Sequence, residues 1–520
     1  MGTIVTTKQG KLQGELHRGV ETFKGIPFAQ PPTGELRFQA PQPPKRWKGI
    51  RLATSYGPAA PQIGPVNRLI RGIIGAAGSK QSQDCLYLNV WTPSCDRRKR
   101  PVMFWIHGGA FILGSGSTPI YQGTRLARRG DVVVVTINYR LGALGFLSWD
   151  GICPGGGGPP ANLGTRDQIA ALEWVRDNIS KFGGDPGNVT VFGESAGAMS
   201  TGTLLGTPSA RGLFHKAILQ SGAAHNVSKT DVAARVGAQF LDYLEVGGDP
   251  VKELLEVPVT QLMRAQARTT ARVGLEDGIM AWQPCVDGDL LPEQPLDAIA
   301  RGDAADIPIM VGSNRDEFKL FMAADRIRLD DRKLDERLRG LMPGVDADGN
   351  ALADRALDAY ARAVGPRGRE ASERWAAFQS DRIFHYPAAR LADLQADHQP
   401  KTYAYLFEWV PPLVGRALGS CHGLELPFVF GGVKAALLRA GLVANPGAAR
   451  LCDQIQDAWI AFAREGEPGH EKLPDWPAYS RFCRYTMTLG DHCTLREDPH
   501  QKGREFWEPL ARHGEAARMF

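Results

Sequence analysis

Residues 188–197 read NVTVFGESAG, an apolar run of strand-forming residues that ends at Ser195. Glycine stands two positions before and two positions after this serine, which gives the pattern G-x-S-x-G. A serine in this pattern occupies a tight, strained turn from a strand into a helix, and the glycines remove side chains that would clash there. The stretch therefore predicts a buried parallel strand, a sharp turn that exposes the Ser195 hydroxyl, and a helix that begins with small residues.

Strand-like runs alternate with helical patterns on both sides of this stretch. Residues 166–182 carry apolar residues at helical spacing and end at a Gly-Gly-Asp-Pro sequence. Strands are expected at residues 101–106, 131–137, 189–192, 215–220, 307–311 and 402–407. The alternation predicts an α/β fold in which a large, mostly parallel central sheet is flanked by helices.

Length alone favours two or three domains, because a single core usually stops growing at about 250–300 residues. The candidate catalytic residues described below, however, run from Gly109 to His422, and any cut between them would divide the site. We therefore expect one domain over residues 1–520. Residues 323–400 are rich in Arg, Asp, Ala and Leu at helical spacing, and we expect them to form a helical insertion near the active site.

Composition restricts the classes of function. The 520 residues are 43% hydrophobic and 22% charged, as in ordinary soluble globular proteins, and the net charge of +5 is too small to favour a nucleic-acid partner. No run of about 18 apolar residues predicts a membrane span. Residues 1–10 lack the pattern of a secretory signal, so we expect a cytoplasmic protein. We also expect a monomer or a small homo-oligomer. The eight cysteines form no C-x-x-C pairs, which argues against a zinc site or a disulfide framework.

A serine hydroxyl needs a base and a group that orients the base. In doubly wound hydrolases these follow in the order serine, acid, histidine. Asp316 and Glu317 both come just after the expected strand 307–311, and either could be the acid. His422 lies in a Gly-Ser-Cys-His-Gly loop beyond a late strand and is the best placed of the histidines.

The developing oxyanion requires hydrogen-bond donors. Residues 106–111 read IHGGAF after an expected strand and are similar to the HGGG-type loop whose backbone N–H groups face this charge. The N–H of Ala196, directly after the serine, is a further donor. His107 precedes the serine and lies in the donor loop, so we expect a structural role for it.

Taken together, these motifs resemble those of the type-B carboxylesterases, the cholinesterase-like branch of the α/β-hydrolases, and most of all the bacterial para-nitrobenzyl-esterase-like members. The resemblance covers nearly the whole chain. It extends over segments at residues 10–14, 23–29, 84–90, 138–142, 182–186, 188–197 and 428–431.

The resemblance implies a Ser-His-Glu triad of Ser195, His422 and Glu317 rather than Asp316. It implies oxyanion-hole donors at Gly109, Ala110 and Ala196, a loop shaped by Gly108, and supporting roles for Glu194, Ser221 and Glu425. It also implies an internal ion pair between Arg140 and Asp167. Where the family has a glutamate to pair with Arg37, this chain has Gln83, which can offer only a neutral acceptor.

The function implied is that of a serine carboxylesterase that hydrolyses neutral carboxylic esters through an acyl-enzyme, with no cofactor and no metal. An amide or carbamate hydrolase would use the same triad, and a non-catalytic cholinesterase-like binding protein belongs to a different class. The complete triad argues against the binding protein. A metallohydrolase is disfavoured because neither H-E-x-x-H nor a clustered His/Asp pattern occurs in the sequence.

Overall fold

The computed structural model of the protein describes residues 2–63, 80–150, 152–153, 157–276, 280–324, 327–346, 349–364, 370–412, 415–433 and 447–512. Its strands are β1 Ile4–Thr6, β2 Lys11–Gln13, β3 Glu15–His17, β4 Val20–Pro27, β5 Ile50–Leu52, β6 Tyr87–Thr92, β7 Arg100–Ile106, β8 Val133–Ile137, β9 Gly184–Glu194, β10 Lys216–Gln220, β11 Ile309–Asn314, β12 Thr402–Phe407, β13 Tyr485–Leu489 and β14 Thr494–Glu497.

The helices follow the strands in alternation over much of the chain. They are α2 Thr124–Gly130, α3 Gly142–Phe146, α4 Leu163–Asn178, α5 Ala196–Leu205, α6 Thr230–Asp242, α7 Pro250–Glu256, α8 Val259–Glu276, α9 Pro295–Ala300, α10 Lys319–Ala324, α11 Asp331–Leu341, α12 Leu352–Ala363, α13 Ala371–Ser380, α14 Tyr386–Ala396, α15 Gly415–Leu418, α16 Leu426–Val429, α18 Gly447–Glu465 and α19 Gln501–Arg512. A π-helical turn, Asp381–His385, joins α13 to α14.

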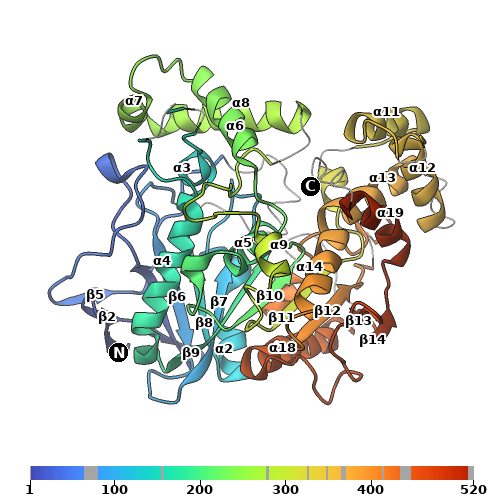
Figure 1. Ribbon diagram of the computed structural model, residues 1–520. Helices are drawn as coiled ribbons and strands as arrows, with labels where there is room; N and C mark the ends of the chain where they lie inside the picture. The colour runs from blue at the N-terminus through green and yellow to red at the C-terminus, as the bar shows by residue number, and fades with distance from the viewer. Residues whose placement is uncertain are drawn as a thin grey trace.

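An 11-stranded sheet forms the centre of the molecule, with the strand order β14-β13-β12-β11-β10-β9-β7-β8-β6-β4-β3 (Figure 1). The strands from β13 to β8 in this order are parallel, and antiparallel strands flank them on both sides. A separate three-stranded sheet contains β1, β2 and β5. The predicted α/β fold with a large, mostly parallel sheet is confirmed.

Both faces of the sheet are buried, as the apolar composition of its strands requires. In β7, Val102, Phe104 and Ile106 face one hydrophobic core together with residues of α4 and α5. Met103 and Trp105 of the same strand face a second core with residues of α2 and α18. The two-residue alternation of a strand thus assigns each neighbouring side chain to a different layer.

The six predicted strands are all present, and the boundaries of the elements differ by a few residues. The helix expected at residues 166–182 is α4, which begins at Leu163 and gives way to a 3-10 turn at Ile179–Phe182. Gly183, at φ 77°, closes this turn in the left-handed conformation that favours glycine. β9 then begins at Gly184 rather than 189, because its first residue pairs with Arg100 of β7.

Helices outside the two main layers gather in two places (Figure 1). The helices α6 and α8 pack together at one end of the molecule. The helices α11, α12, α13 and α19 surround a third hydrophobic core of their own. The structure describes residues 323–324, 327–346, 349–364 and 370–400 of the segment 323–400. Their regular elements are helical apart from one isolated bridge between Val345 and Ala351.

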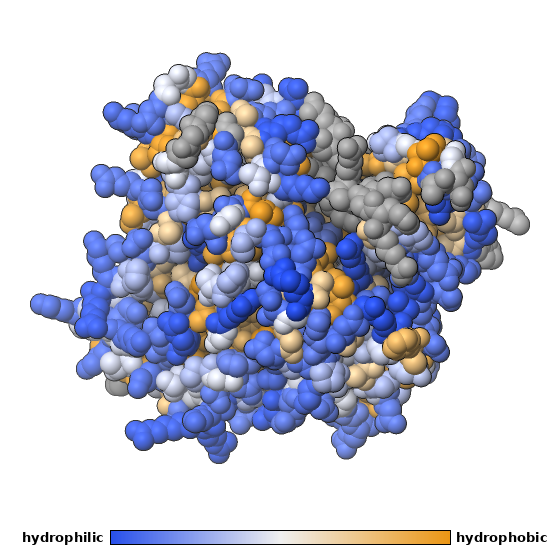
Figure 2. All heavy atoms as spheres, viewed as in Figure 1, coloured by the Kyte–Doolittle hydropathy of each residue, from blue (hydrophilic) through white to orange (hydrophobic). Residues whose placement is uncertain are grey.

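The surface in the view of Figure 2 is mainly hydrophilic, with apolar side chains in scattered patches. None of the helices in the described ranges combines the length and the hydropathy needed to cross a membrane.

The implied ion pair between Arg140 and Asp167 is present and buried. The guanidinium donates from Nη2 to Oδ1 at 2.7 Å and from Nε to Oδ2 at 2.8 Å, and the backbone N–H of Arg140 also donates to Oδ2. Nearby, the Nε of Arg37 donates to Oε1 of Gln83 at 2.8 Å, which is the neutral hydrogen bond expected there. The Arg140–Asp167 pair joins the end of β8 to α4, close to the active site.

Replacement of Asp167 by Asn should lower the free energy of unfolding by about 3–5 kcal/mol, because it leaves the buried Arg140 without a countercharge. Urea denaturation followed by circular dichroism measures this change. Asp289→Asn is the matched control, since Asp289 pairs with Arg166 but its side chain is 76% exposed. The control should change the free energy by less than about 1 kcal/mol. Equal losses in both variants would contradict the assigned role of the buried pair.

Candidate active site

Ser195 lies in a strained turn between β9 and α5. Its backbone has φ 56° and ψ −127°, and α5 begins at the next residue, Ala196. The flanking glycines are sterically required: a Cβ on Gly193 would lie 2.4 Å from the carbonyl carbon of Gly197, and one on Gly197 would lie 2.0 Å from the carbonyl oxygen of Ile106. The turn predicted from the sequence is therefore present, with neighbouring strands packed directly against it.

Glu317 is the acid that contacts His422. It follows β11, has no exposed surface, and its Oε2 accepts a hydrogen bond from Nδ1 of His422 at 2.6 Å. Its Oε1 accepts the backbone N–H of Asn314 at 2.7 Å, so both oxygens are held. Asp316 turns to the other side of the loop, where it accepts the backbone N–H of Ser420 at 3.0 Å. Of the two carboxylates that the sequence left open, the structure brings Glu317 to the histidine.

The other nitrogen of His422 faces the strand that carries Ser195. Nε2 lies 3.0 Å from Oε1 of Glu194, the residue before the serine. Within the described residues no hydrogen bond joins Ser195 to His422. The rings of Phe321 and Phe384 pack against the imidazole, with centroid distances of 5.2 and 4.8 Å.

Buried carboxylates set the charge of His422. Burial alone would lower the pKa of the imidazole, but the carboxylates of Glu194 and Glu317 raise it above the ordinary value of 6.5. The pKa of Glu194 is itself raised, because burial and the nearby Glu425 and Glu317 disfavour a further negative charge. Because the two groups lie 3.0 Å apart and each shifts the pKa of the other, they titrate as a pair.

Glu425 and Ser221, the other two predicted supporting residues, are buried near His422 and Glu317. Glu425 accepts from Nε2 of Gln220 at 3.1 Å and from Nδ2 of Asn314 at 2.6 Å. Gln220 in turn accepts from the indole N–H of Trp459 at 3.0 Å. The buried hydroxyl of Ser221 has no hydrogen-bond partner within the described residues. Neutral amide donors thus compensate the buried Glu425 carboxylate in place of a cation.

The loop after β7 lies against the serine. A Cβ on Gly108 would approach Cβ of Ser195 to 3.0 Å, so only glycine allows this contact. Gly109 and Ala110 have φ of 116° and 52°, and neither backbone N–H finds an acceptor in the described part of the chain. The N–H of Ala196 belongs to the first turn of α5, where helix N–H groups lack partners in the preceding turn. The sequence predicted these three N–H groups as donors to an oxyanion, and this role stays a prediction.

His107 has the structural environment that the sequence analysis expected. It is buried, its Nδ1 lies 2.9 Å from the carbonyl oxygen of Gly108, and its ring stacks on Tyr139 with a centroid distance of 4.6 Å. Burial lowers the pKa of the imidazole to about 4. His107 is therefore neutral at physiological pH and supports the donor loop.

Three residues of the site were missed in the sequence. Asn314 joins Glu317 to Glu425, Gln220 joins Glu425 to Trp459, and Phe384 covers His422 from the π-helical turn. Asn314 ends β11 and Gln220 ends β10, the two strands that follow β9 in the sheet. Their position at the carboxyl ends of these strands is the signal that could have identified them. Phe384 lies within the helical segment, and no pattern there distinguishes it from a core residue.

Comparisons with known proteins agree with this geometry. The model of the carboxylesterase family matches residues 1–507. Para-nitrobenzyl esterase of Bacillus subtilis is 41% identical over 96% of this chain and 98% of its own length, and phenmedipham hydrolase of Pseudarthrobacter oxydans is 35% identical over 94% and 95%. A solved structure of a thermophilic PNB esterase superposes with a TM-score of 0.86 at 39% identity, covering 97% of this chain and all of that one.

Glu194→Gln should shift the acidic limb of the profile of kcat/KM against pH to lower pH by about one unit. Catalysis needs neutral His422, so the rate rises as pH passes through the pKa of that group, and removing a carboxylate beside Nε2 lowers this pKa. Initial rates on p-nitrophenyl acetate between pH 5 and 9 measure the shift, after correction for spontaneous hydrolysis. The exposed Glu173, in α4, provides the control Glu173→Gln. An unmoved limb in Glu194→Gln would show that Glu194 does not control the histidine.

Proposed function

The chain belongs to the carboxylesterase family and is a carboxylic ester hydrolase, and we propose that it cleaves neutral carboxylic esters at Ser195 through an acyl-enzyme. The observation that carries this proposal is the 2.6 Å hydrogen bond between buried Glu317 and His422, beside the strained turn of Ser195. A buried carboxylate on Nδ1 fixes the tautomer in which Nε2 can accept a proton.

In acylation, Nε2 of His422 accepts the hydroxyl proton as Oγ of Ser195 attacks the ester carbonyl carbon. The carbonyl oxygen becomes an oxyanion that faces the N–H groups of Gly109, Ala110 and Ala196. Collapse of this intermediate breaks the bond to the alcohol oxygen, which takes the proton from Nε2. The acyl group then remains on Ser195.

In deacylation, water takes the place of the alcohol. His422 removes a proton from water as its oxygen attacks the acyl carbon. The bond from this carbon to Oγ of Ser195 then breaks, Oγ takes the proton back from Nε2, and the carboxylic acid is released. Glu317 stabilises the imidazolium in both half-reactions and does not become protonated. Between turnovers the charged imidazole pairs with the Glu194 carboxylate, and this pairing accounts for the position of Nε2 in the structure.

The substrate we propose is an uncharged ester with an apolar or aromatic group. Phe321 and Phe384 present aromatic rings beside His422, where the leaving alcohol receives its proton. Such a wall favours apolar groups and offers no countercharge to an ionic one. The name of the related para-nitrobenzyl esterase points to esters of an aromatic alcohol, in agreement with this proposal.

We further propose that the chain acts as one domain with a helical insertion at residues 323–400, in the cytoplasm, as a monomer or small homo-oligomer without a nucleic-acid partner. All eight cysteines are free, as in a reducing compartment. The small net charge of +5 supports an uncharged small-molecule substrate over a polyanion.

Glu317→Gln should lower kcat on p-nitrophenyl butyrate by about 10³–10⁴-fold, because the amide can hold His422 in the wrong tautomer. Asp316→Asn is the matched control, since it changes the adjacent carboxylate and should retain most of the activity. Thermal unfolding of each variant separates a catalytic loss from a loss of fold. A larger loss in Asp316→Asn than in Glu317→Gln, with both variants folded, would refute the proposed triad.

A further inference from the structure

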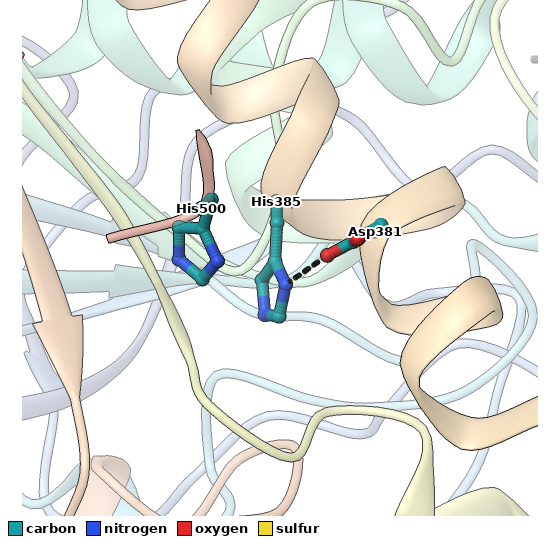
Figure 3. A group of neighbouring side chains, drawn as sticks. All are labelled: Asp381, His385 and His500. Atoms are coloured by element: carbon teal, nitrogen blue, oxygen red, sulfur yellow. Dashed lines mark hydrogen bonds and ion pairs between the residues drawn. The ribbon is translucent and has the colours of Figure 1, made fainter. Parts of the chain in front are cut away.

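Two histidines and an aspartate meet next to Asn314, the last residue of β11, whose carbonyl oxygen lies 2.8 Å from Nε2 of His385. Figure 3 shows Asp381 and His385 on one π-helical turn, with His500 facing them from the segment before α19. Potential ligand atoms of the three side chains all lie within 4.8 Å of one another. They line a cavity of about 480 Å³ that opens to solvent. π-helical turns are rare and occur often at functional sites.

His385 is oriented as metal-binding histidines are. Its Nε2 donates to the backbone carbonyl of Asn314 at 2.8 Å, and this bond turns Nδ1 toward Oδ1 of Asp381, 2.7 Å away. Histidine ligands usually donate their second N–H to a carbonyl or a carboxylate in this way, which fixes the tautomer and the ring plane. Nδ1 of His385 therefore faces Asp381, and it can bind an ion once its proton is displaced.

Asp381 is held by a second set of contacts. Its Oδ2 accepts the hydroxyl of Tyr360 at 2.8 Å, and that hydroxyl accepts the indole N–H of Trp507 at 2.7 Å. Gly503 leaves space for the carboxylate, since a Cβ there would lie 1.9 Å from Oδ2. Ligating carboxylates are commonly fixed by such hydrogen bonds. Oδ1 is therefore directed at the histidines by residues from two other helices.

His500 supplies the third group. Its ring stacks on His385 with a centroid distance of 4.1 Å, it is partly exposed, and one of its nitrogens lies within 4.8 Å of the ligand atoms of the other two side chains. A neutral imidazole with a free lone pair is the form that binds metal ions.

We propose that Asp381, His385 and His500 bind one divalent transition-metal ion, with Zn²⁺ as the ion of best fit. Two imidazoles and a carboxylate, with a fourth position open to the cavity for water, match the ligands and the coordination number of Zn²⁺. The ion replaces the proton between Nδ1 of His385 and Oδ1 of Asp381, and this proton goes to solvent. Nδ1 and Oδ1 must separate by about half an ångström, because ligands about 2.0 Å from a tetrahedral ion lie about 3.3 Å apart. The His500 ring must also turn out of its stack on His385, because the in-plane lone pairs of two stacked rings cannot meet at one ion.

The site would fix the loop that holds the triad. The carbonyl of Asn314 accepts from His385 while its N–H donates to Glu317, and Phe384 on the same π-helical turn packs on His422. An ion here contacts none of the reacting atoms. Its ligands are therefore positioning residues, and the serine chemistry does not depend on the ion for a chemical step.

Cobalt is the probe, because tetrahedral Co²⁺ has a visible absorption band that octahedral Co²⁺ in water lacks. Full-length protein is freed of metal with a chelator, dialysed and titrated with Co²⁺. We expect the band to saturate at one ion per chain, to disappear on addition of one equivalent of Zn²⁺, and the Tm to rise with bound ion. No band, together with no calorimetric heat of Zn²⁺ binding, would overturn the proposal.

His500→Gln should weaken Co²⁺ binding by more than about 100-fold, and Tyr360→Phe by about 10–100-fold through the orientation of Asp381. His492→Gln is the matched control, since His492 is exposed in the turn after β13. Circular dichroism and Tm of the metal-free variants verify folding. If His500→Gln folds and binds Co²⁺ as tightly as the control, the ion lies elsewhere and the proposal fails.

Discussion

A carboxylate without exposed surface, Glu317, is the constraint on which the rest of the active site depends. Removing such a charge from water costs several kcal/mol unless hydrogen bonds and a countercharge replace the lost hydration. The structure supplies both, because Asn314 donates to one oxygen and His422 to the other. The histidine is thus held in place by the same bond that makes the burial of the carboxylate tolerable.

Neutral donors also hold the neighbouring buried carboxylate, Glu425. Asn314 also donates to Glu425, whose second oxygen is held by Gln220. Among the residues that the structure describes, no lysine or arginine forms an ion pair with Glu194, Glu317 or Glu425, so His422 and neutral amides surround these three carboxyl groups. The carbonyl of Asn314 is in turn fixed by His385, so a perturbation at the Asp381 cluster reaches Glu317 through one residue, Asn314. Such a network concentrates negative potential at Nε2, the atom that accepts the Ser195 proton in the proposed mechanism.

The sequence predicted much of this arrangement, and its failures have physical causes. The turn at Ser195 could be predicted because a strained turn requires glycines at fixed positions. The central strands could be predicted because burial on both faces requires continuous apolar runs. Spacing could not separate Asp316 from Glu317, since adjacent residues in a loop point to opposite sides and only tertiary contacts decide which side holds the histidine. The resemblance to a family favoured Glu317, and the structure places that residue against His422.

The cluster of Asp381, His385 and His500 could not be found in the sequence, because His500 is brought to the other two residues by the packing of α19 on α12.

The most direct test of the proposed mechanism is to label the enzyme with phenylmethylsulfonyl fluoride and to locate the adduct by tandem mass spectrometry. Activation of Ser195 by His422 predicts one sulfonyl group per chain, on Ser195, formed in proportion to the loss of esterase activity and absent in His422→Ala. Loss of activity with the label on another residue, or full activity after Ser195 is labelled, would contradict the account.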